Sequence, residues 1–214
     1  MADHQFADAE LAALYDTLHP WESRGDFPFY LPLVMAADAV LDVGCGTGAL
    51  LRRAREQAHP GRLCGLDPAP GMLAQARKRS DIEWILGDLT TVAWDREFDL
   101  IVMTGHAFQV LVTDSELLGS LRAIRSALTT TGRFAFETRN PPVRAWSRWT
   151  PALTMETTDA AGNAVRIWHD VETPVDGDLV SFTTTFASAG RQQESRSTLR
   201  FLDTDSPRSC PTLA

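Results

Sequence analysis

Residues 40–48 read Val40-Leu41-Asp42-Val43-Gly44-Cys45-Gly46-Thr47-Gly48, and the helical pattern Ala49-Leu50-Leu51 follows directly. An apolar run that ends in three alternate glycines is typical of the first strand and first loop of a parallel α/β sheet. Glycine permits a tight turn and lets the backbone approach a ligand closely, while the following helix directs N–H groups at negative charge. Taken alone, the loop has a second interpretation, in which its glycines only tighten a strand-to-helix turn.

After this first strand, further apolar runs alternate with helical patterns. This order predicts a doubly wound α/β fold with a mostly parallel sheet. The expected strands are 39–43, 62–66, 82–86, 98–103 and 132–137. Their apolar residues alternate little with polar ones, as in strands that are covered on both faces. A stripe of Leu117, Leu121, Ile124 and Leu128 predicts a helix that packs on the sheet.

After Pro141-Pro142 the apolar period changes to two residues, which indicates antiparallel strands. Val165, Ile167 and Val171 alternate with polar neighbours, and Asp176-Gly177 offers a hairpin turn to the next strand. We expect up to four such strands after the fifth strand of the parallel sheet. Because so small a sheet does not fold alone, we interpret it as an antiparallel β appendage of the first part.

Charge and cysteine content exclude several classes of protein. Twenty Lys and Arg against twenty-eight Asp and Glu give a formal net charge of −8, which repels nucleic acid and anionic membrane surfaces. Cys45, Cys64 and Cys210 form no CxxC pair, which favours reduced thiols and suggests no metal site. With neither a secretory leader nor an apolar run of membrane-spanning length, the sequence predicts a cytoplasmic protein.

Two acidic residues follow the second and third expected strands. Asp67 comes nineteen residues after Gly48, where a carboxylate reaches ribose hydroxyls, and Asp88 stands where a side chain can meet an adenine edge. Either acid alone is more often a cap of a turn or helix. Because the carboxyl ends of parallel strands meet at one edge of a sheet, the glycine loop and both acids together favour a nucleoside-containing ligand.

With these motifs, residues 39–139 resemble the class I S-adenosylmethionine-dependent methyltransferases of the small-molecule type. The resemblance implies that the acidic-x-Gly-x-Gly-x-Gly loop holds the methionine part of S-adenosyl-L-methionine and that Asp67 binds the ribose. It further implies that Asp88 and the backbone of Leu89 bind the adenine amino group. The implied cofactor-binding residues are Asp42, Gly44, Gly46, Gly48, Asp67, Pro68, Met72, Asp88, Leu89 and Thr104. Pro68 and Met72 would flank the adenine, and Thr104 belongs to the segment beneath the sulfonium.

A nicotinamide or flavin dinucleotide fold is the main alternative for the loop. Such folds need G-x-G-x-x-G to seat a pyrophosphate, whereas Ala49 and Leu50 follow the third glycine here, so that glycine comes one residue early. Asp42, two residues before Gly44, suits an ammonium group better than a diphosphate.

Three residues are candidates for contact with the methyl acceptor: Tyr15, His106 and Trp146. His106 follows the fourth strand and is the candidate base if the acceptor must lose a proton, although a lone histidine in a loop is more often structural or solvated. Tyr15 belongs to an aromatic segment that also contains Trp21, Phe27, Phe29 and Tyr30; this segment either covers the cofactor as a lid or packs a core. In-line transfer demands no particular base, so no catalytic residue is assigned.

Three tryptophans follow the fifth expected strand. Trp146, with Trp149 and Trp168, either walls the acceptor pocket or packs the appendage on the sheet. His19 and His169 are expected at the surface.

Four parts are expected along the chain. They are an N-terminal helical and aromatic lid at 1–37, an S-adenosylmethionine-binding Rossmann-like domain at 38–142, the β appendage at 143–203 as a wall of the acceptor pocket, and an irregular tail at 204–214. Leu11, Leu14 and Leu18 behind an Asp8 cap predict a helix in the first part.

The family usually continues with a helix and a strand hairpin that complete its sheet, and the sequence has no such elements after the appendage. We therefore expect a truncated form in which strand 132–137 is an exposed edge. The predicted function is methyl transfer to a small-molecule acceptor by a monomer or homodimer. The alternatives are a noncatalytic protein that binds S-adenosylmethionine or S-adenosylhomocysteine, and a dinucleotide-dependent oxidoreductase.

Overall fold

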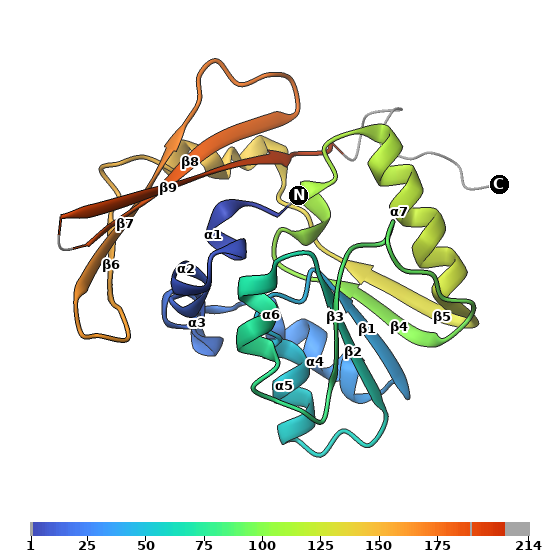
Figure 1. Ribbon diagram of the computed structural model, residues 1–214. Coiled ribbons are helices and arrows are strands. Elements are labelled where there is room, and N and C mark those ends of the chain that lie inside the picture. Colours follow the sequence, from blue (N-terminus) through green and yellow to red (C-terminus); the bar gives the residue numbers. More distant parts are fainter. Residues whose placement is uncertain (1, 189, 204–214) are drawn as a thin grey trace.

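A parallel sheet of five strands, in the order β3-β2-β1-β4-β5, forms one half of the computed structural model, which describes residues 2–188 and 190–203 (Figure 1). Its strands are β1 (Ala39–Val43), β2 (Arg62–Asp67), β3 (Glu83–Leu86), β4 (Phe98–Met103) and β5 (Leu128–Phe136). The direction of winding reverses between β1 and β4, and ligands of such sheets bind outside the carboxyl ends of the strands at this point. The predicted doubly wound α/β fold is confirmed.

Helices cover both faces of this sheet, which explains why its strands are apolar without alternation. The longer helices are α4 (Phe27–Met35), α5 (Ala49–Glu56), α6 (Pro70–Ala76) and α7 (Asp114–Ala127). Leu117 and Ile124 of α7 pack with Leu41 and Ile101 on one face. The apolar side chains of α4 and α5 pack with Val40, Leu63, Leu100 and Val102 on the other face.

The end of α7 departs from the predicted apolar stripe. A capping box of Thr113 and Glu116 starts the helix, but α7 ends at Ala127, and Leu128 already begins β5. The strand therefore starts four residues earlier than predicted. Within the described residues β5 pairs only with β4, and Phe136 is 44% exposed on this outer strand.

The second sheet is antiparallel, with the order β6-β7-β8-β9, and confirms the predicted β appendage. Its strands are β6 (Met155–Thr158), β7 (Ala164–Val171), β8 (Leu179–Ser188) and β9 (Arg191–Arg200). Val165, Ile167 and Phe186 are buried on one face, as the alternation predicted. Short 3-10 helices fill the remaining connections: η1 (Trp21–Ser23), η2 (Ala107–Val110), η3 (Pro141–Val143) and η4 (Ala145–Arg148).

Three short helices, α1 (His4–Ala7), α2 (Ala9–Ala13) and α3 (Tyr15–Leu18), lie between the two sheets (dark blue in Figure 1). Asp8 caps α2 by accepting hydrogen bonds from the Glu10 and Leu11 amides, but the single predicted helix breaks at Leu14. Leu11 and Leu14 pack against the second sheet. On the opposite side, Ala12 packs against Met72 of α6.

The predicted division at residues 37, 142 and 203 stays a prediction, and the predicted irregular tail, residues 204–214, lies outside the described residues. In the described part of the chain, no helix combines the length and the apolar character needed to cross a membrane.

The contact between the N-terminal segment and the second sheet can be tested with Leu14, which is 6% exposed in a cluster with Leu11, Val165, Ile167 and Phe186. Leu14→Ala removes buried methyl groups and leaves a cavity, so we expect the free energy of unfolding to fall by about 2–4 kcal/mol. Leu18→Ala, at the half-buried edge of the same cluster, should cost less than half as much. Urea unfolding measures both, and equal losses would contradict this packing.

Candidate functional site

The glycine loop connects β1 to α5 in a backbone conformation that residues other than glycine rarely adopt. Gly44, Gly46 and Gly48 all have positive φ, between +56° and +76°. A Cβ on Gly48 would lie 2.3 Å from the Trp84 ring, so this glycine is needed for packing inside the fold. A Cβ on Gly46 would meet nothing within 4 Å. Gly46 therefore presents open backbone at the carboxyl edge of the sheet, where a ligand can approach.

Asp42 is the second-last residue of β1, just before this loop, and is 1% exposed. Its Oδ1 atom is buried and has no hydrogen-bond partner in the described part of the chain. Burial raises the pKa of Asp42 to about 7, although nearby Arg24 acts in the opposite direction. A buried carboxylate without a partner is costly, and a cationic ligand would stabilise its charged form. The residue therefore fits a cofactor that carries an ammonium or sulfonium group.

Asp67 ends β2 and is tied to the same loop. Its Oδ2 accepts a hydrogen bond from the Gly46 amide at 2.7 Å, and its Oδ1 accepts one from the Ala69 amide at 2.8 Å. Burial raises the pKa of this carboxyl, and the two hydrogen bonds oppose that shift. Each carboxylate oxygen keeps further acceptor capacity, so Asp67 can also receive hydrogen bonds from a ligand's hydroxyls.

The remaining predicted cofactor residues lie around these two acids in different surroundings. Pro68 is exposed, whereas Met72 is buried beside Ala12 and half-buried Phe6 and Tyr15. Asp88 is exposed, and its Oδ1 accepts hydrogen bonds from the amide and the hydroxyl of Thr90. The Leu89 side chain is buried in the core of the parallel sheet, so only its backbone is available to a ligand.

Thr104 follows β4 in a half-buried turn that includes Gly105 and His106. The Gly105 amide donates a hydrogen bond to Glu137 Oε1 at 2.6 Å, which fixes this turn to the end of β5. Sequence reasoning missed Glu137, although an acidic residue after a strand was the same signal that identified Asp67.

Arg24 is a second residue that sequence reasoning missed. Its guanidinium donates two hydrogen bonds to Asp26, at 2.9 and 2.5 Å, and lies 3.9 Å from the centre of the Phe27 ring. Its charge acts on Asp42, Tyr15 and His106, which places it among the groups of the site. It comes from an irregular segment with no sequence pattern that could have identified it.

His106 and Tyr15, whose contact with the acceptor stays a prediction, both lie beside Phe6. The His106 ring centre is 5.8 Å from that of Phe6, and the Tyr15 ring centre is 6.2 Å from it. Burial lowers the pKa of His106 to about 4, with a further contribution from the charge of Arg139, so this imidazole is neutral near pH 7. Burial raises the pKa of the Tyr15 hydroxyl.

Most of the other aromatic candidates pack cores. Phe27 and Tyr30 are buried with α5 and β1 on one face of the parallel sheet. Trp146 packs against Phe201 with a ring-centre distance of 4.5 Å, within the apolar cluster of the second sheet. Its predicted contact with the acceptor stays a prediction.

Arg139 and Gln109, which sequence reasoning also missed, connect the two sheets. Arg139 Nη1 donates a hydrogen bond to Gln109 Oε1 at 2.7 Å, and Gln109 Nε2 donates one to the Arg200 carbonyl at 3.0 Å. The Arg139 guanidinium lies 5.6 Å from the centre of the Trp149 ring. His169, predicted at the surface, is half-buried near Trp149 and hydrogen-bonded to Thr184 Oγ1, because its strand turns that face inward.

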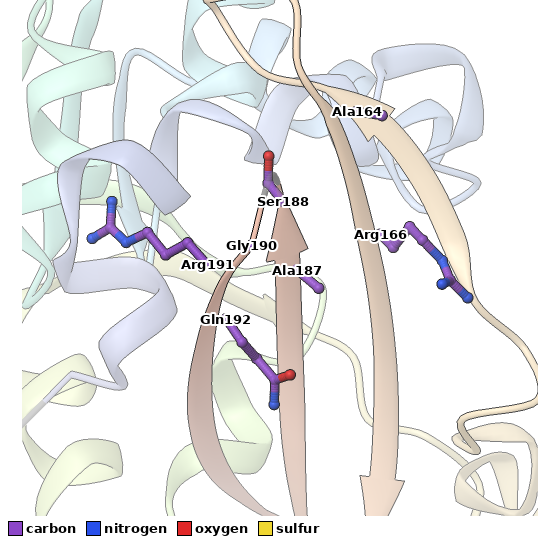
Figure 2. Close-up of a pocket in the computed structure, with 7 residues that line it drawn as sticks. All are labelled: Ala164, Arg166, Ala187, Ser188, Gly190, Arg191 and Gln192. Carbon is purple, nitrogen blue, oxygen red and sulfur yellow. The ribbon is translucent and has the colours of Figure 1, made fainter.

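Two hollows elsewhere contain none of the predicted site residues. One, of about 960 Å³, lies between α2 and the second sheet. The other, of about 380 Å³, lies at the β8–β9 turn, where Figure 2 shows the Arg166 and Arg191 side chains pointing away from one another. No polar groups converge in the smaller hollow, and the larger one contains none of the predicted site residues. The carboxyl edge of the parallel sheet is therefore the better candidate for a functional site.

Comparison with known proteins finds methyltransferases that are similar to this chain. Residues 40–132 match a family described as "Methyltransferase domain". Over 149 residues the chain is 34% identical to the 2-phytyl-1,4-naphtoquinone methyltransferase of Thermosynechococcus vestitus, covering 63% of this chain and 64% of that protein. The chain spans 35–64% of the length of the curated relatives that it matches.

Solved structures show the same fold over most of the chain. DesVI of Streptomyces venezuelae aligns with a TM-score of 0.70 at 20% identity, covering 92% of this chain and 86% of that one. CalS10, an amino pentose methyltransferase from Micromonospora echinaspora solved with S-adenosylmethionine bound, aligns with a TM-score of 0.66 at 21% identity, covering 90% and 84%.

The burial of Asp42 predicts a pH-dependent stability. The pKa lies at about 7 in the folded chain against an ordinary 3.8, so the unfolded chain loses this proton first and stability falls as the pH rises through that window. Relative to Asp42→Asn, the ligand-free protein should lose about 2–3 kcal/mol of unfolding free energy between pH 5 and pH 8. Urea unfolding of both proteins at the two pH values measures this, and a difference that does not change with pH would refute it.

Because the backbone at Gly46 is open, we expect a side chain at this position to weaken ligand binding more than it lowers stability. Gly46→Ala places a methyl group where a ligand would approach, so we expect adenosylhomocysteine to bind at least tenfold more weakly in calorimetric titration. Gly162→Ala is a matched control, because Gly162 also has positive φ and open surroundings but lies in the β6–β7 turn. Both variants should lose about 1 kcal/mol of stability. Equal affinities in the two variants would mean that the loop is only a turn.

Proposed function

We propose that the whole chain is a class I S-adenosylmethionine-dependent methyltransferase that methylates a small-molecule acceptor, because residues 40–132 match the methyltransferase-domain family and its relatives include methyltransferases. The observation that carries the proposal is the buried Asp42 oxygen, which has no partner among residues 2–188 and 190–203, next to a glycine loop whose open face is Gly46. A cation at this position would compensate the Asp42 carboxylate. S-adenosyl-L-methionine carries such a charge.

In this proposal each strand end binds one part of the cofactor. The backbone of residues 44–48 approaches the methionine part, and Asp67 accepts hydrogen bonds from the ribose hydroxyls. Pro68 and Met72 would flank the adenine, and the Asp88 carboxylate would accept a hydrogen bond from its amino group, assisted by the Leu89 backbone. Thr90 already donates two hydrogen bonds to Asp88 Oδ1, so Oδ2 would be the acceptor for the adenine.

The bound cofactor supplies a methyl group on a sulfonium, and the chain's own contribution is to orient the acceptor and exclude water. Thr104 and Gly105, held by Glu137, form the floor of the site. The N-terminal segment covers it, because Asp16 of α3 binds both the Thr47 hydroxyl in the glycine loop and the Arg52 guanidinium. His106 is neutral near pH 7 and can accept a proton, although its low pKa makes it a weak base.

The small size of the acceptor is supported by what the relatives act on. The names of the matched proteins specify a phytylated naphthoquinone, aklanonic acid and a malonyl group on an acyl carrier protein. The net charge of −8 opposes binding of a nucleic acid. Assembly as a monomer or homodimer stays a prediction.

The proposal is tested by calorimetric titration of the folded chain with adenosylmethionine and adenosylhomocysteine. Asp67→Ala removes up to two charge-assisted hydrogen bonds to the ribose, each of about 1.5–3 kcal/mol, so affinity should fall at least tenfold. Asp81→Ala removes an exposed carboxylate, paired with Arg79 outside the site, and should leave affinity unchanged. Tight binding that survives Asp67→Ala would reject this placement of the ribose. Absence of any binding by the folded wild-type chain would refute the proposed function itself.

A further inference from the structure

Arg139 is a half-buried cation without a carboxylate partner in the described part of the chain. No carboxylate of residues 2–188 or 190–203 lies within 4 Å of its guanidinium nitrogens, whereas Arg24, the other arginine of the site, is paired with Asp26 at 2.5 Å. Glu137 is close enough to favour the charged form of Arg139, but its carboxylate is hydrogen-bonded to the Gly105 amide. A half-buried arginine usually finds an anion, so this one is available to a ligand.

The Arg139 guanidinium is held in a fixed position. Gln109, which holds it, is 1% exposed, and both ends of its amide are occupied: one accepts from Arg139 and the other donates to the Arg200 carbonyl at the end of β9. This bond uses Nη1 and leaves the Nε–Nη2 edge of the guanidinium without a described partner. That edge can donate two parallel hydrogen bonds to one carboxylate.

Aromatic side chains lie near Arg139. Trp149 lies under the guanidinium at 5.6 Å, and Arg139 interacts electrostatically with Tyr15 and with His106. Phe6 packs against these two rings. A cation with an open donor edge beside flat aromatic rings is suited to a planar molecule that bears one negative charge.

We infer that Arg139 binds the carboxylate of the methyl acceptor, and that the acceptors are small organic acids with a planar body. The inference rests on the proposed function, because it assigns the substrate class of the same site. Gln109 acts as a positioning residue that fixes the guanidinium through the hydrogen bond from Nη1 to its Oε1 atom. The two charges of the site then have opposite tasks: Asp42 attracts the cationic cofactor and Arg139 attracts the anionic acceptor.

Binding of matched acids and amides tests the inference directly. The full chain, with and without adenosylhomocysteine, is titrated with benzoate, salicylate and 2-naphthoate and with their neutral amides, and NMR chemical shifts report the affinities. We expect each acid to bind at least tenfold more tightly than its amide. Arg139→Gln should abolish this preference, and Arg139→Lys should restore part of it because lysine supplies the charge without the bidentate geometry.

Arg148→Gln is the matched control, because Arg148 is an exposed arginine of the neighbouring helix η4 and should keep the full preference for acids. Thermal unfolding verifies that all variants fold. The inference is overturned if acids and amides bind equally, if no acid binds, or if the preference survives Arg139→Gln. A chain that prefers acids through Arg139 but does not bind adenosylhomocysteine would refute the proposed methyl transfer and leave the anion site established.

Discussion

The hydrogen bond from the Gly46 amide to the Asp67 carboxylate determines the geometry of the rest of the site. It joins the end of β2 to the loop after β1. Because β1 and β2 are neighbours in the sheet, the donors of the loop and the acceptors of Asp67 lie side by side. The positive φ values of the loop are maintained by this bond together with the close packing of Gly48 on Trp84. The N-terminal segment then attaches to the same loop through Asp16 and Thr47.

Strands that lie in the centre of the sheet could be predicted from the sequence, because burial on both faces leaves an unbroken apolar run. The bounds of β1 and β4 agree with the prediction to the residue. The start of β5 could not be predicted, since Leu128 is buried whether it ends α7 or begins the strand. Likewise, the break at Leu14 leaves the apolar spacing of the N-terminal helices almost unchanged, so the pattern could not reveal it.

Acidic residues at strand ends were visible in the sequence because their positions follow from the topology. Arg24 and Arg139 were not visible in this way. Arg24 belongs to the site because its charge acts on residues elsewhere in the chain, such as Asp42 and His106. Arg139 is noteworthy because it has no carboxylate partner among the described residues. Arg139 is positioned by Gln109, thirty residues earlier, which is anchored in turn by β9, ninety-one residues later. Such a relay depends on how the second sheet packs beside the first, and no local pattern encodes that packing.

The N-terminal segment has hydrogen bonds at both of its ends: Asp3 and Gln5 bind serines of β9, and Asp16 binds the glycine loop. Its helices contain only four or five residues each, and helices of that length do not persist in water without tertiary support. If the segment leaves one sheet to admit or release a ligand, it also loses the support that keeps it helical. Detachment of this segment would therefore be the same event as local unfolding of residues 4–18.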